Sequence, residues 1–244
     1  SYSANADMTA MVTRGFLTED EKHFAKKDPT DYVKQLRPAD LIVLREVKAN
    51  YGNMNATALM KHTYLNFPFY AIKSEVASTI LSKMELEKVT ASKPKSNKTI
   101  LFTIGYEGIS LEEYLVRLLK NDVKLLVDVR NNPMSMKYGF SKGQLKKYCA
   151  NLGIEYVHIP EVGIQSDQRQ QLNTQSDYDK LFTVYRKNNL SKTMSSQNAI
   201  LNLLKRHKRI ALTCFEANIC QCHRKHLAEA IENLSGFEYK VEHI

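Results

Sequence analysis

The most reactive-looking stretch of the chain is a short turn near its C-terminus that holds three of its four cysteines within nine positions. Cys214, Cys220 and Cys222 are followed at once by His223 and Arg224. Thiol, imidazole and guanidinium groups serve in nucleophilic attack, proton transfer, metal binding and anion binding. An apolar, strand-like segment precedes the turn and a helical pattern follows it. Because α/β folds keep ligands at such strand-to-helix turns, we expect a functional site here.

The cysteines have three alternative roles, as metal ligands, as a nucleophile or in packing. The spacing from Cys214 through Cys220 to Cys222 is not that of a zinc ribbon or zinc finger, so no metal site is predicted. As a nucleophile, Cys214 would lie at a strand end, where a helix N-terminus favours the thiolate. Phosphatases and sulfurtransferases of that geometry need an arginine or a cradle of amides six residues later, where this chain has Cys220. Cys222, His223 and Arg224 are better placed, and Arg224 could bind a phosphate or carboxylate bidentately.

Other polar side chains follow the earlier strand-like segments. Asp128 and Arg130 flank Val129, so they point to the same face of a strand, either as a structural ion pair or as an anion-binding arginine that its carboxylate orients. Gly105 lies in a turn that either admits a ligand to the backbone or is simply tight. His158 ends another segment, as a core residue or a proton carrier. We expect catalytic roles for Asp128, His158, Glu216, Cys222 and His223, and ligand-binding roles for Gly105, Tyr106, Arg130, Lys142, Glu161, Cys214 and Arg224.

The elements that would position these residues alternate regularly after residue 98. Apolar runs predict strands at 99–104, 124–130, 154–159 and 209–214, with an edge strand at 237–244. Helical patterns separate them, at 110–119, 141–153, 178–185, 198–205 and 223–234. This alternation predicts an α/β fold, a Rossmann-like, mainly parallel sheet flanked by helices. The loops after the strands should therefore meet at one site.

The first part of the chain has a different pattern. Helices are predicted at 38–49, 55–64 and 74–84, as in a small helical or winged-helix module. Such a module either places a helix in the DNA major groove or serves as a docking domain without nucleic acid. The polar, lysine-rich segment that follows predicts a linker. We therefore expect a helical domain at 8–88, a linker at 89–98 and an α/β domain at 99–244.

Composition restricts the class of protein. The chain has 244 residues, 43% of them hydrophobic, and no apolar run approaches the roughly 20 residues that cross a bilayer. Without a signal-peptide pattern, and with clustered cysteines, a cytoplasmic protein is expected. The net charge of +9 is spread over both parts, which fits a solvated surface or contact with nucleic acid. We expect an anionic small molecule or nucleic acid as partner, no membrane, and a homodimer through the helical domain as one alternative. The sequence does not identify a cofactor.

Several short motifs carry a family resemblance. TIGYEG (103–108), LVDVRNNP (126–133), GFSK (139–142), YVHIPEVG (156–163) and the Cys-x-Glu…Cys-His-Arg pattern from Cys214 to Arg224 resemble the DUF-488 family, in this order, over about 99–244. The resemblance implies a Rossmann-like α/β domain. Where the family usually has an arginine after the Pro-x-Ser of the second loop, this chain has Met136. The segment 63–77 more loosely resembles helical modules of antitoxin-like bacterial proteins.

Two functions fit these residues. One is an enzyme, intact or degenerate, that acts on an anionic, nucleotide- or nucleic-acid-like ligand. The arginines would bind the anion, carboxylates would orient them or act as acid and base, and a histidine would carry the proton. The other is a non-catalytic binding module in which the helical domain makes the contact. An enzyme should show a pocket in which Asp128, Arg130, His158, Glu216 and Arg224 converge, whereas a binding module should show them locked in ion pairs.

Overall fold

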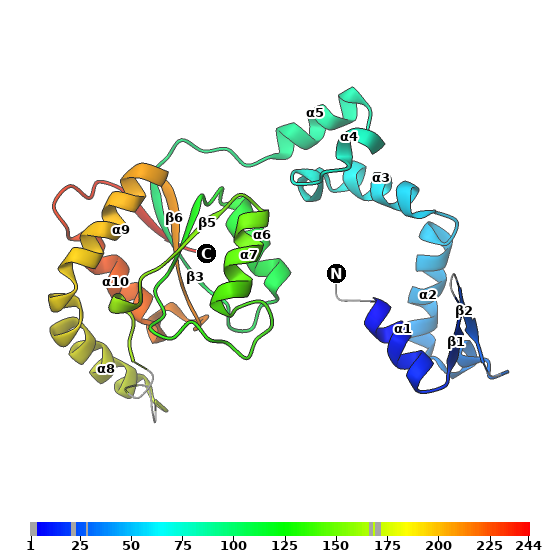
Figure 1. Ribbon diagram of the computed structural model, residues 1–244, viewed down its shortest axis with the longest axis horizontal. Coiled ribbons are helices and arrows are strands. Elements are labelled where there is room, and N and C mark those ends of the chain that lie inside the picture. Colours follow the sequence, from blue (N-terminus) through cyan, green and yellow to red (C-terminus); the bar gives the residue numbers. More distant parts are fainter. Residues whose placement is uncertain (1–3, 21–22, 28, 166–167, 169–171) are drawn as a thin grey trace. The chain divides into compact units, whose positions relative to one another are not determined.

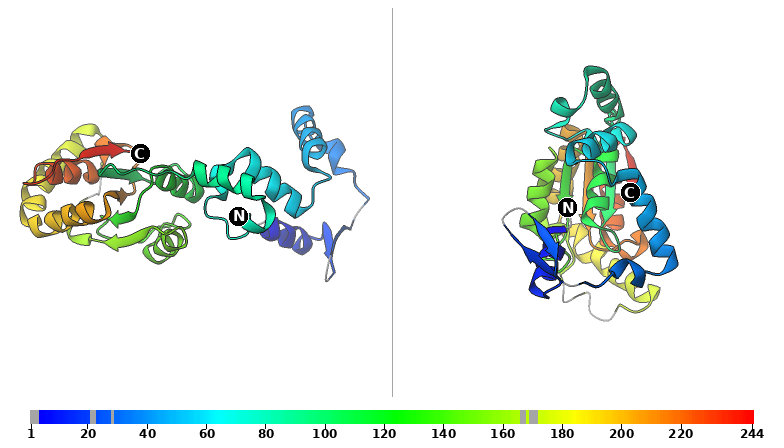
Figure 2. Two further views of the ribbon diagram at one scale, coloured as in Figure 1. Left: turned by 90° about the horizontal axis from the view of Figure 1, so that it is seen from above. Right: turned by 90° about the vertical axis from the view of Figure 1, so that its right-hand side faces the viewer.

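The computed structural model describes residues 4–20, 23–27, 29–165, 168 and 172–244 (Figure 1). The chain divides into two compact units, which Figure 2 shows from two further sides. One, the helical unit, comprises residues 1–70 and 76–86; the other, the α/β unit, comprises 71–75 and 87–244. The domain limits expected from the sequence stay predictions. None of the helices in the described part combines the length and the hydropathy of a membrane span.

The helical unit contains short helices and one small hairpin. Strands β1 and β2 pair antiparallel between the first two helices. Its elements are α1 (Ala4–Thr13), β1 (Leu17–Glu19), β2 (Phe24–Lys26), a 3-10 turn (Tyr32–Gln35), α2 (Pro38–Tyr51), α3 (Ala56–Asn66), a 3-10 turn (Pro68–Ala71), α4 (Ala77–Ile80) and the start of α5 (Lys83–Ser92). The winged-helix alternative stays a prediction.

The predicted helix at 74–84 is wrong, because two helices meet there. Helix α4 ends at Ile80, and α5 begins after a second cap. The backbone amide of Ser82 donates to the Glu85 carboxylate at 2.7 Å, and the Ser82 hydroxyl accepts from the Glu85 amide at 3.4 Å. This reciprocal pair satisfies two amides that a new helix leaves open, and so favours a restart at Lys83. Helix α5 continues into the expected linker, as far as Ser92, with Val89 buried.

The α/β unit is built on five parallel strands in the order β5-β4-β6-β3-β7. The predicted fold class is thereby confirmed, and the last strand lies at an edge as expected. Helices α8 and α9 are longer than their sequence patterns predict. The elements are β3 (Ile100–Gly105), α6 (Leu111–Lys120), β4 (Leu125–Asp128), α7 (Lys142–Asn151), β5 (Glu155–His158), α8 (Gln175–Asn188), α9 (Met194–His207), β6 (Arg209–Cys214), α10 (His223–Glu232) and β7 (Lys240–His243).

Helices cover both faces of the sheet, and each face has its own core (Figure 1). On one face, Leu125 and Leu212 pack with residues of α8, α9 and α10, Leu204 among them. On the other face, Phe102 packs with residues of α6 and α7, such as Tyr114. Successive strand residues point to opposite faces, so a strand that is buried on both sides is mainly apolar along its length. This explains the mainly apolar runs of β3 and β6.

The strand order places β6, whose loop leaves toward one face of the sheet, between two strands whose loops leave toward the other. After β3 and β4 the chain enters α6 and α7 on one face, whereas after β6 it enters α10 on the other. Strand β6 lies between β4 and β3, with Cys214 opposite Gly105 and Thr213 opposite Asp128. Ligands of open α/β sheets bind where such loops part. The fold therefore favours a crevice at the carboxyl end of β6.

Candidate functional site

A pocket of about 310 Å³ lies at this position. Its walls come from the loops that follow β3, β4 and β6, together with the first residue of α10 and one residue of the loop after β5. The lining residues are Tyr106, Arg130, Asn131, Asn132, Met134, Ser135, Met136, Ile164, Cys214, Phe215 and His223. The pocket thus gathers side chains that are up to 117 positions apart in the sequence, from Tyr106 to His223.

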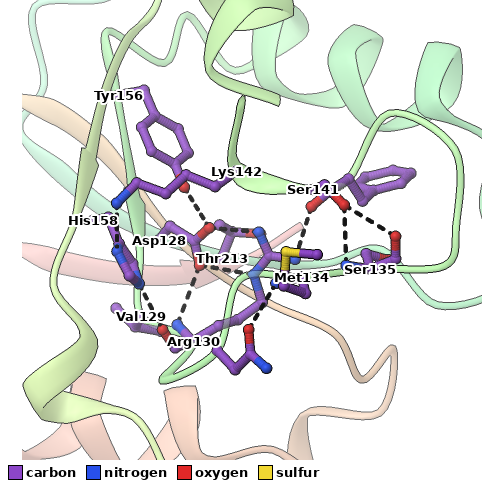
Figure 3. Close-up of polar contacts among 12 residues, drawn as sticks. Asp128, Val129, Arg130, Met134, Ser135, Ser141, Lys142, Tyr156, His158 and Thr213 are labelled. Atoms are coloured by element: carbon purple, nitrogen blue, oxygen red, sulfur yellow. Dashed lines mark hydrogen bonds and ion pairs between the residues drawn. The ribbon is translucent and has the colours of Figure 1, made fainter. Parts of the chain in front are cut away.

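The wall after β4 is organised by a buried ion pair (Figure 3). Arg130 donates through Nε and Nη2 to the two oxygens of Asp128, at 2.8 and 2.5 Å. Its Nη1 donates to the Tyr106 hydroxyl at 2.8 Å and to the Phe140 carbonyl at 2.9 Å. Burial by itself would lower the pKa of Arg130, but the hydrogen bonds and charge of Asp128 outweigh this and raise it. The guanidinium therefore stays charged and fixed.

The carboxylate of this pair has a third partner. Tyr156 on β5 donates its hydroxyl to Asp128 at 2.6 Å (Figure 3). Burial raises the pKa of Tyr156, and the charge of Asp128 raises it further, so the phenol keeps its proton. Asp128 itself is fully buried and has its two oxygens engaged. Its place in the structure is to hold Arg130 rather than to face the pocket.

His158 lies in a separate chain of contacts beside this pair (Figure 3). The Lys142 ammonium is 3.1 Å from Nδ1 of His158, and Nε2 of the ring is 2.9 Å from the Arg130 carbonyl. An ammonium can only donate and a carbonyl can only accept, so Nδ1 accepts and Nε2 carries the hydrogen. His158 and Lys142 therefore support the backbone after β4, and neither lines the pocket.

A thiol, a carboxylate and an imidazole meet where β6 enters its loop. The Cys214 thiol lies 3.2 Å from Oε2 of Glu216 and 3.6 Å from Nδ1 of His223. Nε2 of His223 lies 3.1 Å from the Val129 carbonyl, which can only accept. In the neutral ring this bond places the hydrogen on Nε2 and turns the bare Nδ1 toward the thiol. Cys214 and His223 both line the pocket.

Cys222 is the third residue of this cluster, and it is buried next to Cys214 and His223 without lining the pocket. Burial raises the pKa of its thiol well above the usual value, and the neighbouring Cys214 and Glu216 raise it further. The side-chain ligand atoms of Cys214, Cys222 and His223 all lie within 4.8 Å of one another, so these residues could hold a metal ion.

The other two cysteines lie outside this cluster. Cys149 is buried in the core on the other face of the sheet, where burial raises the pKa of its thiol to about 12. Cys220 is exposed.

Arg224 fixes the loop rather than facing the pocket. Its guanidinium is buried and donates to the carbonyls of Glu216 and Ala217, the latter at 3.2 Å. Gly105 serves the same loop, since a Cβ at this position would lie 1.9 Å from the Glu216 carbonyl oxygen. Its lack of a side chain therefore admits a neighbouring strand-to-helix loop. The sequence predicts a ligand near Gly105 and Arg224. In the structure both residues contact protein backbone instead.

The loop between β4 and α7 supplies lining residues that the sequence analysis did not select. Ser141 donates to the Ser135 carbonyl at 3.0 Å and accepts from the Ser135 amide at 3.1 Å (Figure 3). The side chain of Asn132 accepts from the Met134 amide at 3.1 Å. These turns hold Met134 and Met136 outward, and the Met136 side chain is fully exposed at the pocket. Their place after a strand end was the signal that could have identified them.

The predicted residues thus fall into three groups. The pocket is lined by Tyr106, Arg130, Cys214 and His223. A second group contacts the side chains or backbone of these lining residues: Gly105, Asp128, His158 and Glu216. Cys222 belongs to this second group, because its sulfur lies close to Cys214 and His223. The pocket lining does not include Lys142, Glu161 or Arg224. Convergence on one pocket is therefore partial, and the role of each residue stays a prediction.

Comparison with known proteins places these motifs in a family. Residues 110–231, half of the chain, match the family model described as Domain of unknown function DUF488. The chain belongs to the DUF488 family. The matched segment runs from the cap of α6 into α10 and includes the loops after β4 and β6. No curated protein and no solved structure matches the chain significantly. The resemblance expected from the motifs is confirmed, whereas that of the helical unit to antitoxin-like modules is not.

Proposed function

We propose that the α/β unit of this DUF488 protein binds or acts on an anionic, nucleotide- or nucleic-acid-like ligand in the pocket at the carboxyl ends of β3, β4 and β6. One observation carries the proposal. A single pocket brings together a guanidinium, a thiol and an imidazole, from Arg130, Cys214 and His223, at the point where the strand order makes the loops diverge.

An anionic ligand fits the charge and hydrogen-bonding groups of the wall. The contacts of Arg130 with Asp128, Tyr106 and Phe140 leave one Nη2 hydrogen for a ligand. Asn132 and Ser135 add neutral polar groups beside it. Asp128 partly offsets the charge of Arg130, so the wall favours a phosphate or carboxylate group without being strongly positive.

A planar apolar group fits two exposed side chains of the lining, one from the loop after β6 and one from the loop after β4. Phe215, which follows Cys214, is 42% exposed, and Met134 is 75% exposed. Exposed aromatic and thioether side chains at a pocket can stack on a flat ring. A nucleotide-like ligand, with an anionic group and a planar ring, would use both the polar and the apolar side chains of the lining.

The reacting groups would come from the β6 end of the pocket. His223, which the Val129 carbonyl orients, is suited to carry a proton, and Glu216 lies beside Cys214 as a second proton acceptor. Asp128 would position Arg130, and Arg224 would hold the loop after β6. His158 would act on the backbone of Arg130 rather than on the ligand.

A charge introduced at Met136 tests the proposal without disturbing the core, because this side chain is fully exposed and lines the pocket. Wild type, Met136→Arg and Met136→Glu would be titrated at low salt with inorganic phosphate, a nucleoside monophosphate and a short single-stranded oligonucleotide, with binding read by thermal shift and calorimetry. We expect Met136→Arg to bind roughly threefold to tenfold more tightly and Met136→Glu to bind more weakly by a similar factor, as for one partly screened charge.

The matched control is Met84→Glu, which adds the same charge to an exposed methionine of the helical unit. It should leave binding at the pocket unchanged. If both Met136 variants bind every anion as the wild type does, the pocket is not the anion site. An oligonucleotide whose affinity falls in Met84→Glu but not in Met136→Glu would favour the other function, a binding module whose helical unit makes the contact.

A further inference from the structure

The cluster behind the pocket has the composition and spacing of a metal-binding site. Cys214, Cys222 and His223 each present one ligand atom, and these atoms all lie within 4.8 Å of one another. In a tetrahedral zinc site with Zn–S near 2.3 Å and Zn–N near 2.0–2.1 Å, a sulfur and a nitrogen ligand lie about 3.5–3.6 Å apart. The Cys214 sulfur lies 3.6 Å from Nδ1 of His223.

We infer that Cys214, Cys222 and His223 bind one Zn²⁺ ion, with its fourth coordination position open to the pocket. The inference rests on the proposed function only for the ligand that would occupy this position. Thiolate and imidazole ligands together select zinc rather than magnesium or calcium, which prefer oxygen. Two thiols would each release a proton to solvent on binding, so two thiolates balance the charge of the ion.

Rigid elements already hold the three ligands in place. Cys214 is the last residue of β6, paired in register with Gly105 of the parallel strand β3. Cys222 caps α10, and His223 is its first residue. Metal ligands on strand ends and helix starts are oriented by the fold rather than by a loop. No large rearrangement is therefore needed to close the three ligands around an ion.

The imidazole is oriented as metal-bound histidines usually are. Nε2 of His223 lies 3.1 Å from the Val129 carbonyl, which directs Nδ1 toward the two sulfur atoms. A histidine that binds a metal through one nitrogen normally donates through the other to a carbonyl or carboxylate, which fixes the ring and its tautomer. Packing alone would not require this arrangement beside two thiols.

The fourth coordination position would face the pocket, because two of the three ligands line it. Cys214 and His223 line it, whereas Cys222 is fully buried behind them. Glu216 lies 3.2 Å from the Cys214 sulfur but does not belong to the converging group of ligand atoms, so the fourth position is left to the pocket. Three protein ligands with one exchangeable position are the arrangement of catalytic rather than structural zinc. An ion there could polarise an anionic group that Arg130 also contacts.

Cobalt substitution tests the inference on the full chain. The protein would be reduced with a phosphine, stripped with a chelator and titrated with Co²⁺. We expect thiolate-to-cobalt charge-transfer absorption and the strong visible bands of tetrahedral cobalt, saturating at one ion per chain and lost on addition of Zn²⁺. Adding inorganic phosphate should shift the visible bands, because an anion enters the open position.

Two substitutions assign the ligands. Cys222→Ser and His223→Gln should each weaken Co²⁺ binding by at least the roughly 10- to 100-fold that loss of a supporting contact already produces. Cys220→Ser is the matched control: it removes an exposed thiol of the same turn and should bind Co²⁺ as the wild type does. An absence of charge-transfer absorption in the reduced wild type would overturn the inference, whether or not any variant folds. So would an unchanged spectrum in Cys222→Ser.

The metal site and the anion site can fail separately. Met136→Glu removes none of the three ligands and should still bind one Co²⁺ ion per chain with thiolate charge-transfer absorption. If cobalt binds as expected but phosphate and nucleotides do not, the metal inference stands and the proposed function fails. If these anions bind to the metal-stripped protein in a Met136-dependent way and no cobalt binds, the proposed function stands and the metal inference fails.

Discussion

Two helices of equal length show how differently the two units are built. Both α2, in the helical unit, and α9, in the α/β unit, have 14 residues. Helix α9 buries Gln197, Ile200, Leu201 and Leu204, whereas α2 has no buried residue. Isolated helices of this length are marginal in water, and most helix stability in proteins comes from packing an apolar face. The core of the α/β unit therefore stabilises α9, whereas α2 has no buried face to stabilise it.

The difference follows from what each unit offers its helices. The α/β unit has a five-stranded sheet whose two apolar faces accept three helices on one side and two on the other. Among its described residues, the helical unit has one hairpin with strands of three residues each. Apolar residues of α2 stay exposed as a result, Ile42 and Val43 by 58% and 57%. Exposed apolar surface of this kind is typical of protein contacts.

The strongest test of this comparison uses one ion pair from each unit. The buried Asp128–Arg130 pair has side chains 0% and 6% exposed, and the Arg37–Asp40 pair has side chains 83% and 44% exposed. We expect Arg130→Met to destabilise the α/β unit by about 3–5 kcal/mol, because it leaves a buried carboxylate without its partner. Arg37→Met should change the stability of the helical unit by less than about 1 kcal/mol.

Hydrogen exchange read by mass spectrometry can measure both effects, since it reports on peptides of each unit separately. Similar losses of protection in the two variants would contradict the comparison. In that case the Asp128–Arg130 pair would be accessible to water in solution, and its contacts with Tyr106 and Tyr156 would add little to the stability of the site.

A pair of leucines tests the packing itself. Leu204 on α9 is fully buried, and Leu44 on α2 is 41% exposed. We expect Leu204→Ala to lower the free energy of unfolding of the α/β unit by roughly 2–5 kcal/mol, because it leaves a cavity in a dense core. Leu44→Ala should change that of the helical unit by no more than about 0.5 kcal/mol. Chemical unfolding followed by circular dichroism, with hydrogen exchange to assign the units, measures both. A large loss in Leu44→Ala would mean that a partner covers α2 in solution.

The same contrast explains how far the sequence could predict the structure. Mainly apolar runs identified β3 and β6, because strands covered on both faces are largely apolar. Weak apolar periodicity in the helical unit gave no comparable constraint. The break between α4 and α5 was missed, since it depends on the reciprocal contacts of Ser82 with Glu85 rather than on hydrophobic spacing.

The sequence predicts the position of the pocket at the carboxyl ends of the strands, but not which side chains of the loops line it. The rule for parallel sheets predicts that Cys214 and Arg130, which are far apart in sequence, lie at one edge of the sheet, and both line the same pocket. It could not show that Arg224 turns toward the Glu216 carbonyl, because a helix start allows a side chain several directions. Nor did it select Asn132 or Ser135, whose positions depend on turns of the loop after β4. Loop geometry was the missing information.

The smallest predicted effects, on the pKa of helix-capping carboxylates, should be alike in the two units. These caps lie at the protein surface and do not depend on a hydrophobic core. Hydrogen bonds from Ser82 lower the pKa of Glu85 in the helical unit, and hydrogen bonds from Thr174 lower the pKa of Asp177 in the α/β unit. A carboxylate whose folded-state pKa is lowered stabilises above its unfolded-state pKa, and this contribution is lost as the pH falls through the folded-state value. We expect carbon-detected NMR titrations to place both midpoints below the ordinary range.

Amide variants provide the control for these caps. Glu85→Gln and Asp177→Asn should each reduce the acid dependence of stability of their own unit and leave the other unit unchanged, since neither group is buried. A lowered midpoint for Asp177 but an ordinary one for Glu85 would show that the start of α5 is not formed in solution. The two units would then differ in local structure as well as in packing, because a cap bond persists only where the helix behind it does.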